Sequence, residues 1–386
     1  MKKHPAILGL LVLMFSISSF AIDQQQIAST NVVAPVIEGK SWLLIDQDSG
    51  AVLSAGDPDL QIEPASLTKL MTAYIIFREL AEGRQNLDDM VFVSEKAWRM
   101  EGSRMFIKVN TNVKLEDLVK GMIIQSGNDA TVALAEHVAG TEESFVGLMN
   151  KVAAELGMTR THFVNSSGMP GEGHLTTSRD LATLTRALIN KYPQYYKYYS
   201  VKDFTWNKIK QGNRNILLYR DPSVDGVKTG YTESAGYCLI GSAQREGMRL
   251  IAVVTGTGSK QARADMVQNL LNYGFRNYIT QAIYPAGKLI QNVDVYKAAS
   301  NSVAVESVDK ISLTVPRRGG AELTQTVTIP DYVIAPIASG QVLGNIEFSV
   351  QGSSLGKYPL TAVTDIPEGG IIDQLIGTVM LWVADF

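Results

Sequence analysis

The sequence predicts an α/β (α+β) domain with an antiparallel sheet flanked by helices, followed by a small all-β domain and a C-terminal amphipathic helix. Helical periods dominate residues 66–191, and apolar strand patterns lie on both sides of that region. Alternating patterns without a helical period fill residues 279–366. The length of 386 residues is enough for two such domains.

The first domain is expected over 36–278. It opens with a β-hairpin over 41–54, because an apolar strand is followed by the turn 46–50. Apolar residues then recur at the helical period in several segments, and apolar runs suggest three later strands. The expected helices are 66–80, 115–124, 129–138, 143–156, 177–191 and 261–275, and the strands are 224–228, 237–243 and 250–255.

A change in pattern near residue 280 predicts a separate β-sandwich-like domain over 279–366. Glycine and proline punctuate this region. Its strand candidates are 310–315, 324–329, 344–350 and 358–363.

The last segment, 367–386, is expected to be an amphipathic helix that anchors the protein to a membrane. It is nearly all apolar, yet its helical part is short for a span of about 20 residues. The alternative is a terminal helix docked on a core or a partner. The segment lacks lysine and arginine, which would weaken its attraction to anionic lipid.

The N-terminus has the pattern of an export signal. Lys2 and Lys3 precede an apolar run over 6–20, and Ser19 and Ala21 are the small residues expected at a cleavage site. We expect a signal peptide over 1–21 and a linker over 22–35. The predicted location is periplasmic, with the chain attached peripherally to the outer face of the inner membrane. A membrane-spanning N-terminal helix is the alternative, for which the apolar run is short.

The composition and the motif search argue against several classes of function. The formal net charge of −3 gives no basic face for a nucleic acid. Cys238 is the single cysteine, so no internal disulfide can form, and its apolar neighbours favour a packing role. No histidine, glutamate or cysteine spacing resembles a metal site, and no phosphate-binding loop is found, so no cofactor is expected.

Three short motifs occur in one order along the first domain. They are Ser66-x-x-Lys69, Ser126-x-Asn128 and Lys228-Thr229-Gly230. Each is weak alone, because Ser-x-x-Lys recurs at 307–310 and 354–357 and because serine and asparagine also cap helices. Only the set at 66, 126 and 228 has all three in sequence, which makes the joint pattern specific.

The residue types suit nucleophilic catalysis. A serine hydroxyl needs a base, and residues three apart on a helix share a face, so Lys69 is expected beside Ser66. Burial and neighbouring positive charge lower the pKa of a lysine, and Lys228 is the expected source of that charge. Ser126 is expected to relay a proton and Asn128 to hold a substrate amide. Lys228 to Gly230 are expected to end an edge strand, where Gly230 lets a substrate backbone approach.

Longer segments around these motifs resemble the low-molecular-mass D-alanyl-D-alanine carboxypeptidases, which are penicillin-binding serine enzymes. The resemblance runs from about residue 42 to the C-terminus. The segments that carry it are 63–72, 125–130, 213–215, 224–230, 233–237 and 247–250.

The resemblance implies a penicillin-binding, β-lactamase-like transpeptidase fold and removal of the terminal D-alanine from peptidoglycan stem pentapeptides. It implies Ser66, Lys69 and Ser126 as catalytic residues, an oxyanion held by the N–H groups of Ser66 and Tyr231, and β-lactams as covalent inhibitors. Arg263 matches the arginine that receives the substrate carboxylate. The implied substrate-binding residues are Asn128, Lys228, Thr229, Gly230, Tyr231, Arg263, His174 and Arg214. Tyr231 is a departure, because the family usually has histidine there.

Other functions remain as alternatives at this point. A β-lactamase would need a base for deacylation, and Glu172 is the only acid in the comparable loop. A D,D-endopeptidase would use the same motifs on cross-linked peptides. An inactive scaffold protein is the remote alternative, and the complete motif set argues against it.

Overall fold

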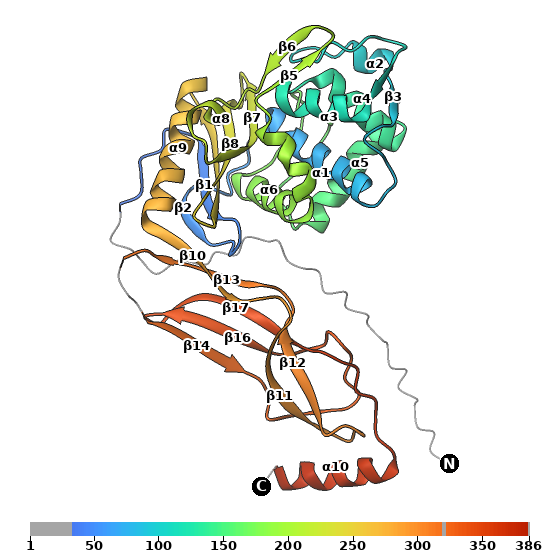
Figure 1. Cartoon of the computed structure of the whole chain (residues 1–386), viewed down its shortest axis with the longest axis vertical. Helices are drawn as coiled ribbons and strands as arrows, with labels where there is room; N and C mark the ends of the chain where they lie inside the picture. The colour runs from blue at the N-terminus through green and yellow to red at the C-terminus, as the bar shows by residue number, and fades with distance from the viewer. Residues whose placement is uncertain (1–32, 319–321, 385–386) are drawn as a thin grey trace.

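The computed structural model describes residues 33–318 and 322–384 (Figure 1). An α/β domain occupies one end of the molecule, and an elongated β-domain extends from it to helix α10 (Ile371–Ala384) at the other end. The predicted signal peptide and most of the predicted linker lie outside the described residues. None of the helices in the described part of the chain meets the length and apolarity needed to cross a bilayer.

The α/β domain is built on a five-stranded antiparallel sheet in the order β2-β1-β9-β8-β7. Helix α9 covers one face through apolar contacts that include Val267 and Leu271, with the short helix α8 in the same cluster, and the helices that surround α1 cover the opposite face. The elements are β1 (Ser41–Asp46), β2 (Val52–Gly56), β7 (Val224–Thr232), β8 (Gly236–Arg245), β9 (Met248–Thr257) and α9 (Lys260–Asn277). This arrangement leaves β7 at an edge of the sheet, beside the helices.

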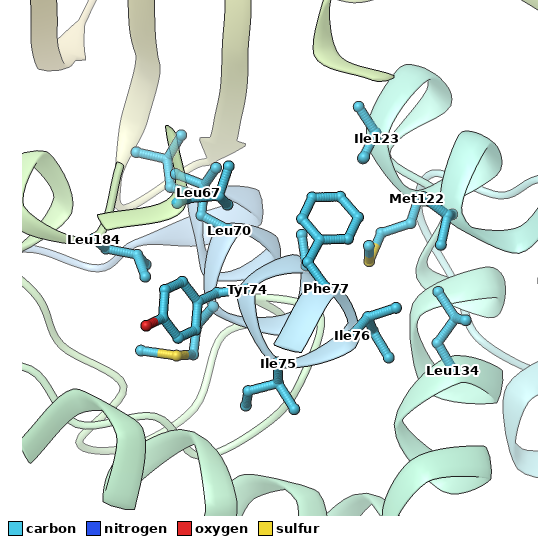
Figure 2. Packing of buried hydrophobic residues seen from close by; sticks show 14 of the residues in the cluster. Leu67, Leu70, Tyr74, Ile75, Ile76, Phe77, Met122, Ile123, Leu134 and Leu184 are labelled. Atoms are coloured by element: carbon cyan, nitrogen blue, oxygen red, sulfur yellow. The ribbon is translucent and has the colours of Figure 1, made fainter. Parts of the chain in front are cut away.

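The helical part packs around α1 (Lys69–Ala81), which is almost wholly buried. Figure 2 shows Tyr74 and Leu184 on one side of α1 and Phe77 directed toward the side of Met122. The remaining elements are β3 (Met90–Phe92), α2 (Glu95–Trp98), β4 (Asn112–Lys114), α3 (Leu115–Lys120), η2 (Gly121–Gln125), α4 (Asn128–Ala139), α5 (Glu142–Glu155), α6 (Ser178–Lys191), α7 (Pro193–Tyr196), η3 (Lys197–Ser200), β5 (Asp203–Trp206), β6 (Ile209–Gly212) and α8 (Leu217–Arg220).

The predicted helix over 66–80 begins differently from the expectation. Residues Ala65–Thr68 form a 3₁₀ turn, η1, and the α-helix starts only at Lys69. Ala65 has a φ of 47°, a left-handed conformation that few non-glycine residues adopt. Side chains three apart eclipse in a 3₁₀ turn, so the expected pairing of Ser66 with Lys69 survives the change of helix type.

Two other predicted boundaries are corrected. The stretch over 115–124 is an α-helix that widens into the π-helical turn η2, and Asn128 is the first residue of α4 rather than part of the break. Strand β7 continues to Thr232, so Lys228 to Gly230 lie inside the edge strand and not at its end. Pairing with β8 as far as Gly236 extends the strand, which a strand pattern of five residues could not reveal.

The β-domain contains a six-stranded sheet in the order β14-β16-β17-β12-β11-β15 and a two-stranded ribbon, β10-β13. Ile346, Phe348 and Leu360 are central to its core. The strands are β10 (Tyr278–Tyr284), β11 (Lys288–Tyr296), β12 (Ser302–Ser307), β13 (Ile311–Pro316), β14 (Leu323–Thr328), β15 (Tyr332–Ile334), β16 (Val342–Val350) and β17 (Ser353–Ala362). The four predicted strands are present, whereas β10, β11, β12 and β15 were missed.

Candidate active site

Ser66 lies on η1, where three chain segments meet. Gly230 of β7 packs directly against this turn, because a Cβ on Gly230 would lie 3.2 Å from both Leu67 Cγ and Pro64 O. Gly168 approaches from the other side, and a Cβ there would lie 1.8 Å from Ala65 O. The absent side chain of Gly230 therefore first admits the serine turn itself, rather than only a substrate backbone as the sequence suggested.

Lys69 points back to Ser66 and is 1% exposed. Its Nζ lies 3.1 Å from Ser66 Oγ and 2.8 Å from Asn128 Oδ1. It also donates to the backbone carbonyl of Ser167. Burial first, and the positive charge of Arg214 second, lower the pKa of Lys69 to about 7. An uncharged amine next to the serine hydroxyl is therefore accessible near neutral pH.

Ser126 and Lys228 form the second hydrogen-bonded pair. Lys228 Nζ donates to Ser126 Oγ at 2.8 Å, although the two residues are 102 positions apart. Ser126 ends η2 in the left-handed conformation, with a φ of 65° and a ψ of 35°. A non-glycine residue in this conformation carries strain, which packing around the site must maintain.

Arg214 adds to the effect of burial on Lys69, and Lys69 and Lys228 repel each other as like charges. The pKa of Lys228 is itself lowered well below its usual value, by burial and then by Lys69, Arg214 and Arg263. Because the like charges of Lys69 and Lys228 oppose each other, each amine makes protonation of the other less favourable. The guanidinium of Arg214 keeps its proton and is held by its Nε, which donates to Gln125 O at 2.9 Å.

Arg263 reaches the sheet from α9. Its Nη1 donates to Gly230 O at 3.0 Å and to Cys238 O at 3.3 Å, and burial lowers its pKa to about 10. Thr229 is buried in β7, whereas Tyr231 is half exposed and stacks on Tyr237 with ring centroids 4.3 Å apart. These predicted binding residues thus gather along one end of the edge strand.

His174 lies behind the serine turn and does not contact Ser66 or Lys69. Its Nδ1 accepts from Val164 N at 3.0 Å, which leaves the proton on Nε2, 2.8 Å from Thr68 Oγ1. Thr68 Oγ1 in turn donates to Ala65 O at 2.8 Å. Burial lowers the pKa of His174 to about 4, so this histidine is neutral and supports the turn from outside the cluster.

Asn128 is placed between the two pairs. Besides accepting from Lys69, it donates through Nδ2 to Glu101 O at 2.7 Å. Its neighbour Asp129 accepts from Met105 N at 2.8 Å and from Phe106 N at 2.7 Å. These contacts hold the segment 100–107 against the start of α4.

The sequence reasoning did not find Asp129, Asn165, Ser167 and Glu142, although all of them shape the site. Asn165 Oδ1 accepts from Gly168 N at 2.7 Å and from Met169 N at 3.1 Å, which closes the turn that contains Ser167. The run of asparagine, serine and glycine over 165–168 is a turn signal that could have been recognised. Backbone carbonyls carry no sequence signal, so the role of Ser167 could not have been found.

The arrangement can activate a serine hydroxyl. A neutral amine has two hydrogens and one lone pair, and Lys69 has two pure acceptors, Asn128 Oδ1 and Ser167 O. When both hydrogens are used there, the lone pair faces Ser66 Oγ, the remaining neighbour. Among residues 33–318 and 322–384, no group of three or more histidine, cysteine, aspartate or glutamate side chains could hold a metal ion.

Two family models cover most of the chain. Residues 28–259 match the Peptidase_S11 family, described as D-alanyl-D-alanine carboxypeptidase. Residues 278–368 match the C-terminal domain of penicillin-binding protein 5.

Individual relatives agree with these models. The D-alanyl-D-alanine carboxypeptidase DacC of Escherichia coli is 39% identical over 95% of this chain and 92% of its own length. The solved structure of penicillin-binding protein 5 from Haemophilus influenzae covers 88% of this chain and 100% of that chain, at 39% identity and a TM-score of 0.82. Penicillin-binding protein D2 of Listeria monocytogenes, solved in its ampicillin-bound form, covers 63% of this chain and 100% of its own, at 29% identity and a TM-score of 0.58.

The penicillin-binding fold, the matched family models and the coverage of full-length relatives lead to one assignment. The chain belongs to the D-alanyl-D-alanine carboxypeptidase family and is a serine-type hydrolase of that class.

Proposed function

We propose that Ser66 forms the acyl-enzyme when this carboxypeptidase removes the terminal D-alanine from peptidoglycan stem pentapeptides. The carbonyl of the penultimate D-alanine is attacked, and the terminal D-alanine is the leaving group. Water then attacks the ester and frees the enzyme. The observation that carries the proposal is the Lys69 amine, which lies 3.1 Å from Ser66 Oγ while Asn128 and Ser167 supply acceptors for its hydrogens.

Each proton transfer has a proposed carrier. Neutral Lys69 accepts the proton of the Ser66 hydroxyl as the acyl bond forms. Ser126 passes its hydroxyl proton to the amine of the departing D-alanine and takes a replacement from Lys228, to which it is hydrogen-bonded. The proton taken up by Lys69 then returns Lys228 to its starting state. The tetrahedral oxyanion is proposed to bind the backbone N–H groups of Ser66 and Tyr231, a preorganised pair on η1 and β7.

The free carboxylate of the substrate is proposed to bind at the electropositive end of β7. Arg263 uses Nη1 for strand carbonyls, and Arg214 uses Nε for Gln125 O. Other guanidinium N–H groups of both residues make no hydrogen bond within the described residues, so they can donate to a carboxylate beside Thr229. Asn128 would have to exchange its bond to Glu101 O before it could hold a substrate amide.

We also propose that β-lactams acylate Ser66. Supporting this, relatives of 29% identity are solved in ampicillin-bound and cefotaxime-bound forms. A strained β-lactam amide would occupy the place of the terminal peptide bond and be attacked by the same hydroxyl.

The experiment that tests the nucleophile combines intact-mass measurement after benzylpenicillin, peptide mapping of the adduct and an assay of D-alanine release from a pentapeptide. One adduct per chain on the peptide containing Ser66 is expected, and S66A should lose both adduct and release. Ser354→Ala is the matched control, because it removes the serine of a second Ser-x-x-Lys sequence in the β-domain. An adduct that persists in S66A would defeat the assignment.

For the whole chain we propose export by a signal peptide over 1–21, a linker over 22–35, a catalytic domain over 36–278, a β-domain over 279–366 and an anchor over 367–386. The anchor would attach the enzyme to the periplasmic face of the inner membrane. Supporting this, α10 exposes a row of apolar side chains that includes Ile372 (72%), Leu375 (64%) and Val379 (61%). Its Gly377 lies against the β-domain, where a Cβ would be 2.5 Å from Lys297 N.

Cosedimentation with vesicles of phosphatidylethanolamine and phosphatidylglycerol tests the anchor. The chain without its signal peptide should bind, and both removal of 371–386 and Val379→Asp should abolish binding. Leu289→Asp, which places the same charge on an exposed apolar position of the β-domain, should bind as wild type. Undiminished binding by the truncated chain would contradict the anchor.

A further inference from the structure

The loop over 163–169 supplies one of the three neighbours of the Lys69 amine. The carbonyl of Ser167 accepts from Nζ, and unlike a side chain it can be moved only by moving the loop. The direction of the Lys69 lone pair therefore depends on where this loop is held. An error of about 1 Å in such a position can cost on the order of 100-fold in rate.

Several side chains hold the loop next to Ser167. Thr72 Oγ1 of α1 donates to Ser166 O at 2.7 Å, and Asn165 closes the following turn. Glu142 of α5 accepts from Ser166 N at 3.0 Å and from Ser166 Oγ at 2.6 Å, both through Oε1. Of these three anchors, Glu142 is the only charged one, and it binds the residue immediately before Ser167.

The surroundings of Glu142 suit a carboxylate with a fixed position. The residue is 8% exposed and stands in the first turn of α5, where the helix dipole favours a negative charge. Its other oxygen, Oε2, lies 3.0 Å from Lys96 Nζ. Lys96 is also bound to exposed Glu143 at 2.7 Å, so the lysine keeps a partner if Glu142 loses its charge.

We propose that Glu142 is a positioning residue for the general base, because it fixes Ser166 and through it the Ser167 carbonyl that orients Lys69. The proposal rests on the proposed role of Lys69. Glu142 does not touch the substrate or the reacting atoms. Without it, the buried N–H and O–H groups of Ser166 lose their acceptor, and the loop must shift to find another.

The test measures the second-order rate constant of acylation by benzylpenicillin, per folded molecule, across pH 5 to 9 in the full chain without its signal peptide. In E142A the acylation rate constant at the high-pH plateau should fall by about 10- to 100-fold. The pH at which acylation reaches half its plateau should also fall. Without Glu142 the ammonium form of Lys69 loses the Ser167 carbonyl as an acceptor, and this lowers the pKa of Lys69. E142Q should recover most of the rate, since its amide oxygen can accept both bonds from Ser166. E143A should match wild type, as it removes only the exposed partner of Lys96.

A purely structural role predicts a different result. It would lower the folded fraction, leaving the rate constant and midpoint of the folded molecules unchanged, and that outcome would overturn the proposal. Equal losses in E142A and E142Q would overturn it as well. If E142A does not fold, the same measurements are made on E142D, whose shorter side chain cannot place its carboxylate against Ser166 in the same way. Failure of the proposed function is separate, since wild type would then give no adduct on Ser66.

Discussion

At the scale of single residues, the chemistry depends on a lysine that can lose its proton. Burial and, after it, the charge of Arg214 lower the pKa of Lys69 to about 7. The pKa of Lys228 is lowered well below its usual value as well, by burial and then by the charges of Lys69, Arg214 and Arg263. Burying several positive charges together is unfavourable, and the lowered pKa values of the two lysines reduce that free-energy cost.

Acylation by benzylpenicillin should therefore rise with pH and reach half its plateau near pH 7, because the neutral form of Lys69 is the base. Lys69→Arg, which keeps a charge and cannot act as a base, should lower the rate constant by about 10²- to 10⁴-fold. Stopped-flow acylation at several pH values checks both. A rate that stays constant from pH 5 to 9 in wild type would show that Lys69 is not the base.

His174 gives a second pH dependence, in stability rather than in rate. Burial, and next the charge of His162, depress the pKa of His174 to about 4. The unfolded chain binds a proton near pH 6.5, whereas the folded chain resists until about pH 4, so stability is lost as pH falls between these values. The loss is about 3 kcal/mol at most. Urea unfolding at pH 7 and pH 4.5 should show a smaller pH-dependent loss in His174→Gln than in wild type.

At the scale of elements, the sequence located the long helices and the strands of the five-stranded sheet, but neither how their ends meet nor the short elements. The short elements not predicted are β3, α2, β4, α7, η3, β5, β6 and α8. The period over 66–80 correctly marked α1, yet the 3₁₀ turn η1 arises because Gly168 and Gly230 allow neighbouring segments to press on Ala65 and Leu67. Likewise, Lys228 to Gly230 were placed at a strand end, while pairing with β8 extends β7. Such ends are set by partners distant in sequence, which local patterns do not record.

Gly168→Ala tests the packing of this turn. Gly168 has a φ of +87°, and Gly140 at the end of α4 has a φ of +79° with no atom within 4 Å of the point where a Cβ would lie. Gly140→Ala should cost about 1–2 kcal/mol of unfolding free energy from backbone strain alone. Gly168→Ala should cost more and also slow acylation by about 100-fold, because Ala65 and Ser66 must move. If Gly168→Ala and Gly140→Ala had the same effect on chemical denaturation and the same effect on acylation, the close approach at Gly168 would be contradicted.

At the scale of the whole molecule, the two domains meet at the turn between β1 and β2. Ser49 Oγ and Thr314 Oγ1 lie 2.6 Å apart, and Lys310 Nζ lies 2.6 Å from Asp48. Thr280 of β10 donates to Asp46, whose burial raises the pKa of its carboxyl group. Polar bonds of this kind fix the β-domain relative to the catalytic domain, and therefore the distance between the site and α10 (Figure 1).

Thr280→Val should loosen this joint, since it leaves one oxygen of the buried Asp46 carboxylate without its donor. We expect a loss of about 1–3 kcal/mol of unfolding free energy and a broader distribution of shapes in small-angle scattering. Acylation should stay unchanged, because the joint lies away from Ser66. Thr324→Val, at an exposed position of β14, is the control and should change neither measurement.

The sequence by itself determined the fold class, the order of the three motifs and the elements that carry them, because these depend on periodicity and on short spacings. The fold family followed from the resemblance of longer segments to a known family. Tertiary structure alone decided the surroundings of Lys69. Ser167 is 98 positions away from it and contributes only a carbonyl, while Arg214 adds a positive charge that the sequence analysis did not place near this amine. The pKa of a buried amine follows from which groups the fold brings within a few ångströms, and neither hydropathy nor spacing along the chain encodes that distance.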